Sequence, residues 1–258
     1  MNFLAVIGRV VFSFLRAAGQ IGLFAVNAIR HMITPPFYPR ELFRQMMNIG
    51  YYSLPVVGLT TLFTGAALAV NIYEGSSRFN AESTLPTIVV IGIVRELGPT
   101  LCGLIVAGRV SASMAAELGT MRVTEQIDAL ATLSTDPFKY LIAPRILATV
   151  IMMPLMLVIV ADTIGVLGGY LLATTKLGYN SANYMKSTID FLEAIDVMAS
   201  LTKATVFGFF ISLMGCYHGF NTRGGAQGVG ISTTNAVVSA CIMILLSNYV
   251  VTEMFFSS

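Results

Sequence analysis

The charged residues of this 258-residue chain are few, and those that could carry chemistry gather in two places. Arg95 and Glu96 are adjacent within an otherwise apolar stretch, and a second group lies in the segment 109–145. That group consists of Arg109, Glu117, Arg122, Glu125, Asp128, Asp136, Lys139 and Arg145. Ionic side chains in such places could bind a charged ligand or a partner protein, or could fix the packing of helices.

The sequence lacks the usual signatures of a catalytic centre. It contains no H-E-x-x-H or G-x-S-x-G motif, and His31 and His218 are far apart in the chain. Its three cysteines lie singly in apolar runs, which argues against a disulfide framework or a zinc site. The glycine-rich stretch 224–228 lacks the Lys-Ser/Thr of a P-loop, so we expect a turn there. We therefore expect no enzyme activity, metal or cofactor in the chain itself.

Composition indicates a membrane protein. Hydrophobic residues make up 55% of the chain and charged residues 11%, whereas soluble domains carry about 25% charged residues. Such a chain cannot cover a surface that faces water, so lipid must be its solvent. The net charge of +2 is too small to argue for nucleic-acid binding, and no nucleic-acid motif is present.

Five apolar segments are long enough to cross a bilayer, which takes about 20 residues. They are 45–73, 83–108, 145–175, 199–220 and 231–255. The polar segment 176–196 is expected to form a loop or a short surface helix. No internal repeat or linker is visible, so we expect one all-α integral membrane domain that covers residues 1–258.

The N-terminal segment 1–33 has a different pattern. Its polar residues recur at steps of three, four and seven, which places them on one stripe of a helix. They are Asn2, Arg9, Ser13, Arg16, Gln20 and Asn27. We expect an amphipathic helix that lies in the membrane interface, with a poor transmembrane span as the alternative. Pro35 and Pro36 should end this helix.

The distribution of Lys and Arg predicts the orientation. One side of a five-span protein would hold Arg9, Arg16, Arg30, Arg40, Arg44, Arg109, Arg122, Lys139, Arg145 and Arg223. The other side would hold Arg78, Lys176 and Lys186. We therefore expect a cytoplasmic N-terminus, a cytoplasmic region 109–144 between the second and third spans, and a C-terminus on the outside.

Helical spacing within the region 109–144 suggests a surface for contact. Val123, Ile127 and Leu130 follow the i, i+4, i+7 pattern of one helix face. Asp136 and Pro137 are typical of an N-cap followed by the first residue of a new helix. An amphipathic helix here could dock into a partner or pack on its own bundle, and spacing alone leaves both open.

Four motifs in this part of the chain resemble the MlaE family of ABC-transporter permeases. They are RELGP at 95–99, AGR at 107–109, AELGTM at 116–121 and EQIDA at 125–129. The resemblance extends to the order of five spans and so covers essentially the whole chain. It implies the permease subunit of a bacterial phospholipid transporter, similar to the chloroplast lipid-import permease.

The resemblance also implies partners. These are a second copy of the chain, a cytoplasmic ABC ATPase that holds ATP and Mg, a periplasmic MCE-domain lipid-binding protein, phospholipid and, in many relatives, a STAS-domain protein. We expect the chain to lie in a bacterial inner membrane, since no transit peptide is visible.

Two sites are implied by the same resemblance. The helix that couples to the ATPase would include Glu117, Leu118, Met121, Arg122, Glu125, Gln126 and Asp128. A lipid-binding cavity between the two copies would be lined by Leu68, Tyr73, Phe79, Arg95, Glu96 and Lys203. Asn248 replaces an acidic residue of some relatives, which weakens an ionic role for the last span.

The pair Arg95–Glu96 keeps two interpretations open. Adjacent side chains on a helix point about 100° apart, so each needs a different partner. The pair could line the lipid pathway, or it could fix helix packing through Lys203 or Asp162. A secondary transporter with Arg95, Glu96 and Asp162 as a proton relay is the alternative function, although the repeated halves common in such carriers are not visible.

Overall fold

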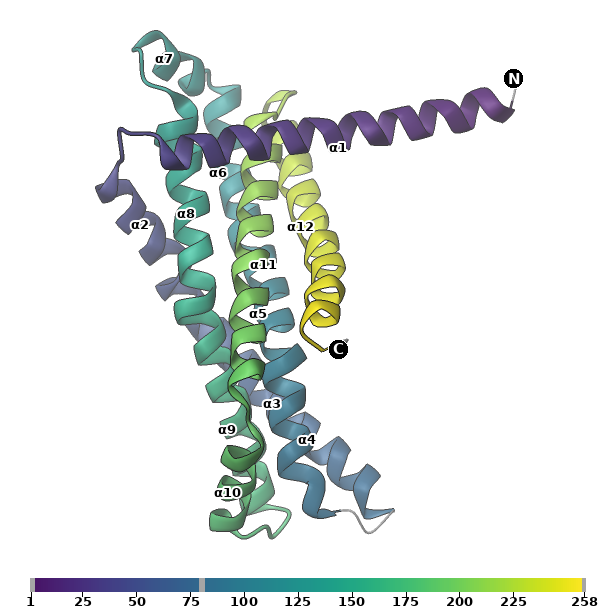
Figure 1. Ribbon diagram of the computed structural model, residues 1–258. Helices are drawn as coiled ribbons and strands as arrows, with labels where there is room; N and C mark the ends of the chain where they lie inside the picture. The colour runs from purple at the N-terminus through teal and green to yellow at the C-terminus, as the bar shows by residue number, and fades with distance from the viewer. Residues whose placement is uncertain (1–2, 79–81, 257–258) are drawn as a thin grey trace.

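The computed structural model describes residues 3–78 and 82–256, and every regular element in these two ranges is a helix. Five continuous helical segments form a bundle (Figure 1). They are Pro39–Ser77, Leu85–Val123, Phe138–Thr175, Ala194–Phe220 and Gly225–Phe256. Each is long and apolar enough to cross a bilayer, so the expectation of an all-α integral membrane protein is confirmed.

Several of these segments contain more than one helical element. The first consists of α2 (Pro39–Ile49), η1 (Tyr51–Ser53) and α3 (Leu54–Ser77). The second follows η2 (Glu82–Thr84) and consists of α4 (Leu85–Ile91), η3 (Gly92–Leu97), α5 (Gly98–Val106), η4 (Ala107–Ser111) and α6 (Ala112–Val123). The third consists of η5 (Phe138–Ile142), α8 (Ala143–Met152), η6 (Met153–Val158) and α9 (Ile159–Thr175). The fourth is α11 (Ala194–Phe220) and the fifth is α12 (Gly225–Phe256).

The N-terminal helix α1 (Phe3–Ile33) runs across one end of the bundle rather than along it (Figure 1). Its length and composition from Val11 to Ile33 would also permit a span. Many of its large apolar side chains remain exposed, however, with Phe12 at 74% and Leu23 at 69%, whereas Phe24 is buried. A helix with this placement and these side chains suits the membrane interface.

Two short helices lie outside the five segments. At one end, α7 (Gln126–Thr132) follows α6, and at the other, α10 (Ser181–Phe191) follows α9 (Figure 1). The Asn180 side chain accepts hydrogen bonds from the backbone N–H groups of Ala182 and Asn183, which caps α10. The expectation of a loop or short surface helix between residues 176 and 196 is met by α10.

The close packing of α3 against α9 depends on glycine. A Cβ atom added to Gly65 would collide with the carbonyl oxygen of Gly165, so the two backbones are in close contact. Ala161, Gly165 and Gly169 form the matching small-residue face of α9, and all three are buried. Small residues let membrane helices approach in this way, so this face packs within the subunit.

Several boundaries differ from those expected. The second helical segment continues past residue 108 to Val123, so the first part of the expected cytoplasmic region, residues 109–123, belongs to the same helical segment as the span. The chain then breaks at Glu125, which has a left-handed φ of 59°. Val123 and Ile127 therefore do not share one helix, and the prediction of a single i, i+4, i+7 face is wrong. Hydropathy misses such continuity because it detects where lipid ends, not where a helix ends.

The other four segments each begin before the expected residue, and the first of them begins at Pro39 rather than 45. The third segment begins at Phe138 rather than 145, where the Asp136 carboxylate accepts a hydrogen bond from the Phe138 N–H at 2.9 Å. The fourth begins at Ala194 rather than 199, and α12 begins at Gly225 rather than 231. In each case polar residues at the helix end lowered the apolar signal without ending the helix.

Candidate functional site

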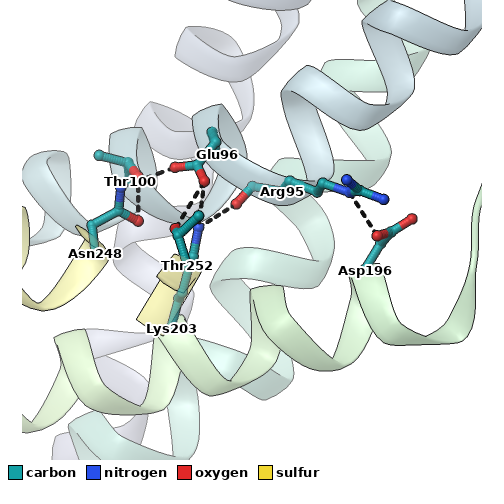
Figure 2. A network of polar contacts seen from close by, with 7 residues as sticks. All are labelled: Arg95, Glu96, Thr100, Asp196, Lys203, Asn248 and Thr252. Carbon is teal, nitrogen blue, oxygen red and sulfur yellow. Dashed lines mark hydrogen bonds and ion pairs between the residues drawn. The ribbon is translucent and has the colours of Figure 1, made fainter. Parts of the chain in front are cut away.

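A network of seven polar residues joins η3, α5, α11 and α12 (Figure 2). Its members are Arg95, Glu96, Thr100, Asp196, Lys203, Asn248 and Thr252. Arg95 and Glu96 lie in η3, a π-helical turn within the second segment. Single π-helical turns inside α-helices are frequent at functional sites. In this turn, the side chains of Arg95 and Glu96 both contact residues of other helices in the bundle.

Glu96 is the centre of the network. Its Oε1 lies 2.8 Å from the Lys203 Nζ and accepts a hydrogen bond from the Thr252 hydroxyl at 2.9 Å. Its Oε2 accepts a hydrogen bond from the Asn248 side-chain amide at 2.9 Å. Asn248 and Thr252 are four residues apart, so they lie on one face of α12. The side chain of Glu96 is nevertheless 42% exposed, so it is not enclosed by the network.

Lys203 is fully buried, and its ammonium group needs compensation. Glu96 supplies the counter-charge, and the backbone carbonyl of Arg95 accepts a second hydrogen bond from Nζ at 2.6 Å. Pro99 has no N–H, so it cannot donate to this carbonyl four residues earlier. The sequence motif 95–99 thus provides both a carboxylate, from Glu96, and a carbonyl, from Arg95, for one buried lysine.

Arg95 forms the second ion pair of the network. Its Nε lies 2.7 Å from Oδ1 of Asp196, which is fully buried in the first turn of α11. The other oxygen of Asp196 accepts a hydrogen bond from the Glu193 N–H, and this completes a capping box. The guanidinium lies 4.4 Å from the centre of the Phe256 ring and remains about one third exposed. Arg95 is therefore held at one nitrogen while part of its surface is accessible.

The structure decides between the two partners expected for the Arg95–Glu96 pair. Lys203 is confirmed as the partner of Glu96. Asp162 is wrong as a partner, because its Oδ2 accepts a hydrogen bond from Ser200 at 2.8 Å and its carboxylate lies against Gly98. Asp196 was expected at the end of the polar segment 176–196, which was predicted to be a loop or a short surface helix. The spacing Glu193-x-x-Asp196 before an apolar run is a capping-box signal that could have placed it on a helix.

The apolar residues expected in the cavity lie elsewhere in the protomer. Leu68 and Tyr73 pack against a small buried cluster that includes Leu85, Val89 and Ile93. Phe79 lies outside the described residues. Within one protomer, the structure therefore brings together Arg95, Glu96 and Lys203 but does not place Leu68 or Tyr73 in the network.

A separate apolar cavity of about 460 Å³ lies between α4, α9, α10 and α11. Its lining includes Val94, Asp162, Tyr170, Tyr184 and Leu201. Tyr184 is only 2% exposed, and its hydroxyl has no hydrogen-bond partner within the described ranges. Burial, with a smaller contribution from Tyr179, raises the pKa of Tyr184 to about 12. None of the six residues expected in the lipid cavity contributes to this lining among the described residues.

The residues expected to contact the ATPase divide into two groups. Leu118 is fully buried in the core, and Glu117 is half-exposed and lies 3.1 Å from the buried guanidinium of Arg145. The other group is near the break after α6. Met121 is partly buried, Arg122 pairs with Asp128 at 2.6 Å, and Glu125, Gln126 and Asp128 are exposed. The second group is thus available for contact.

Comparisons with known proteins agree on one family. Residues 42–254 match the family model described as Permease MlaE. A probable ABC transporter permease protein of Rickettsia prowazekii is 54% identical over 97% of this chain and 96% of its own length. The intermembrane phospholipid transport system permease protein MlaE of Haemophilus influenzae is 31% identical over 100% of this chain and 99% of its own. A chloroplastic protein of Arabidopsis thaliana, named TRIGALACTOSYLDIACYLGLYCEROL 1, is 33% identical over 92% of this chain and 67% of its own.

Proposed function

Since the chain belongs to the MlaE permease family, we propose that it is the membrane subunit of an ATP-driven transporter that moves phospholipid between the inner membrane and a periplasmic carrier. The observation that supports this most directly is the charged network of Figure 2, in which Arg95 and Glu96 stay partly accessible inside a membrane-spanning segment. Ionisable groups at such depth are costly and usually mark a substrate pathway.

The proposed lipid site uses both signs of charge. The partly exposed guanidinium of Arg95 suits a headgroup phosphate, since arginine binds phosphate with several parallel N–H groups. Glu96 and Lys203 would form the polar surroundings of the headgroup next to Arg95. Leu68, Tyr73 and Phe79 would contact acyl chains, where each buried CH₂ contributes about 0.8 kcal/mol. In this proposal, a second copy of the chain completes the cavity.

Coupling to a cytoplasmic ATPase would use the exposed residues at the break after α6, namely Glu125, Gln126 and Asp128. From Glu96 to Val123 the helical segment is continuous, roughly 40 Å long at 1.5 Å per residue. A displacement of this end would therefore reach the charged network through one helix rather than through a flexible loop. ATP and Mg would be held by the ATPase, and this chain would supply no catalytic group.

The remaining partners and the location complete the proposal. We place the chain in a bacterial inner membrane, with α1 and α7 on the cytoplasmic side and the C-terminus on the periplasmic side. An MCE-domain protein would exchange lipid at the periplasmic end, and a STAS-domain protein would accompany the ATPase. No residue of the chain is assigned to nucleic-acid binding.

The test is purification of the tagged chain from detergent-solubilised membranes, followed by mass spectrometry of the bound proteins and lipids. We expect an ABC ATPase, an MCE-domain protein and phospholipid to co-purify with the chain. A folded chain that emerges alone and free of lipid would contradict the proposal. It would favour the secondary transporter, although the described hydrogen bonds join Asp162 to Ser200 rather than to Arg95 or Glu96.

A further inference from the structure

A hollow of mixed polar and aromatic lining lies far from the charged network, between α1, the start of η5 and the adjacent end of α11. Its volume is about 580 Å³. Polar side chains from α1 and from the turn after α11 line this hollow together. They include Arg16, Gln20 and Asn27 on one side and Asn221 and Arg223 on the other.

The charge of this hollow is uncompensated. Arg16 and Arg223 come from opposite ends of the sequence, and no Asp or Glu is among the residues that line the hollow. Neither arginine belongs to an ion pair in the part of the chain that the structure describes. Two guanidinium groups that face one space without a carboxylate favour an anionic ligand, and phosphate suits their geometry.

Aromatic rings form the base of the hollow. The centre of the Phe24 ring lies 5.2 Å from that of Phe138 and 5.5 Å from that of Tyr217. Phe138 also lies 5.3 Å from Phe220. A base of packed rings under a cationic rim matches a ligand with an apolar part and an anionic head. Aromatic residues of this kind are enriched at the level of lipid headgroups.

The position of α1 fixes the depth of the hollow in the membrane. The helix lies across the end of the bundle, and α7 extends further outward than α1 (Figure 1). Phe12, Leu15 and Val26 on α1 are 74%, 56% and 63% exposed, so they need contact with hydrocarbon. The hollow beside α1 therefore lies at headgroup depth, whereas the surface for a soluble partner lies beyond it on α7.

We propose that this hollow binds the phosphate headgroup of an anionic phospholipid from the leaflet in which α1 lies. Arg16 and Arg223 contact the phosphate, the nearby amides contact the polar part of the head, and the first methylenes of the acyl chains cover the aromatic base. The bound lipid joins α1 to the turn between α11 and α12. This site is separate from the transport pathway, and the proposal depends on membrane insertion but not on the transported substrate.

The test compares two spin-labelled lipids around the full chain in phosphatidylcholine vesicles. The measured quantity is the motionally restricted fraction of labelled phosphatidylglycerol relative to that of labelled phosphatidylcholine. Unmodified protein should prefer phosphatidylglycerol, and the preference should fall about fivefold for each arginine removed in R16Q/R223Q. The matched control is R40Q/R44Q, which removes the same charge from exposed positions of α2 outside the hollow.

Each outcome decides the proposal. A preference that persists in R16Q/R223Q overturns it, as does an equal loss in R40Q/R44Q, because general surface charge would then explain the effect. An unchanged preference with loss of a co-purifying ATPase assigns the arginines to a protein partner and also overturns it. If the double variant does not fold, R16Q and R223Q measured singly provide the same comparison, since both side chains are exposed.

Discussion

At the scale of single residues, Lys203 is a charged group whose burial is costly. Its ammonium is fully buried, and its compensation comes from the carboxylate of Glu96 and from the backbone carbonyl of Arg95. Removing one partner of a buried ion pair leaves the other charge uncompensated, whereas replacing both can be neutral. Replacing both Glu96 and Lys203 therefore tests whether the pair only fixes helix packing or also binds lipid.

A double-mutant cycle on this pair gives the first prediction. Glu96→Gln should destabilise the folded chain by about 3 kcal/mol, the low end of the usual range, because Glu96 is partly exposed. E96Q/K203M should recover most of that stability. The measurement is thermal unfolding in detergent, together with lipid transport by the reconstituted complex.

Transport supplies the decisive readout of that cycle. If E96Q/K203M is stable and assembled but transports poorly, the charges act on the lipid. Full transport by this double variant would instead show that Glu96 and Lys203 serve only to pack the helices. It would contradict the proposed lipid site.

Tyr184 offers the opposite case, a buried polar group without compensation. Its hydroxyl has no partner in the described structure, while its ring packs edge-on against Tyr170 and Tyr179. Tyr184→Phe keeps the ring contacts and removes the unsatisfied hydroxyl, so stability should rise by about 1 kcal/mol.

The pH dependence of this residue follows from its raised pKa. With a folded pKa of about 12 against an unfolded value of 10.0, the folded chain disfavours the phenolate. Below pH 10 the group is neutral in both states and contributes nothing. As the pH rises from 10 to 12, the unfolded state ionises first and stability falls. The melting temperature should therefore fall between pH 10 and pH 12, and Tyr184→Phe should reduce that fall. If the variant loses as much stability as the unmodified chain, Tyr184 is not the group responsible.

At the scale of elements, the junction between α6 and α7 is the most specific feature. Glu125 is exposed at a left-handed position, directly after the helix that leads to the charged network. Glu125→Lys should lower co-purification of the ATPase at least about tenfold, because a reversed charge at a contact costs several kcal/mol. The control is Glu74→Lys, an exposed charge reversal near the other end of the bundle. Normal co-purification with Glu125→Lys would argue against docking at this junction.

The packing of α3 on α9 yields a prediction with an internal control. Gly65→Ala forces a methyl group against the backbone of Gly165 and should destabilise the chain by about 1–3 kcal/mol. Gly75→Ala, in the same helix, meets nothing within 4 Å and should be neutral or stabilising by up to about 1 kcal/mol. Thermal unfolding of both variants checks the difference. Equal melting temperatures would mean that α3 and α9 separate easily.

At the scale of the whole molecule, the sequence predicted what composition and periodicity can encode. Apolar runs located all five segments of the bundle. The polar stripe correctly predicted a helix at the N-terminus, whereas its interfacial position stays a prediction, because length and composition would also permit a span there. The continuity from the second span into α6 escaped detection, because polar residues at 109–123 resemble a loop to any measure of hydropathy.

The candidate site was predicted only in part, for a related reason. Glu96 and Lys203 are charges inside apolar runs and therefore stand out. Asp196 lies at the edge of a polar stretch, and Asn248 and Thr252 are common in membrane helices, so their shared contact with the network depends on tertiary structure. No local sequence pattern predicts that α11 and α12 pack against η3.

The balance of charge in the network has a consequence for energy coupling across the membrane. Arg95 and Lys203 are matched by Glu96 and Asp196, so the cluster carries no net charge if all four are ionised. The transmembrane voltage acts on net charge, at about 2.3 kcal/mol per elementary charge and 100 mV. Motion of the intact cluster should therefore draw nothing from the membrane potential, and transport by vesicles should not change when the potential is collapsed with valinomycin and potassium. Glu96→Gln leaves one uncompensated positive charge, and whatever transport that variant retains should become sensitive to voltage.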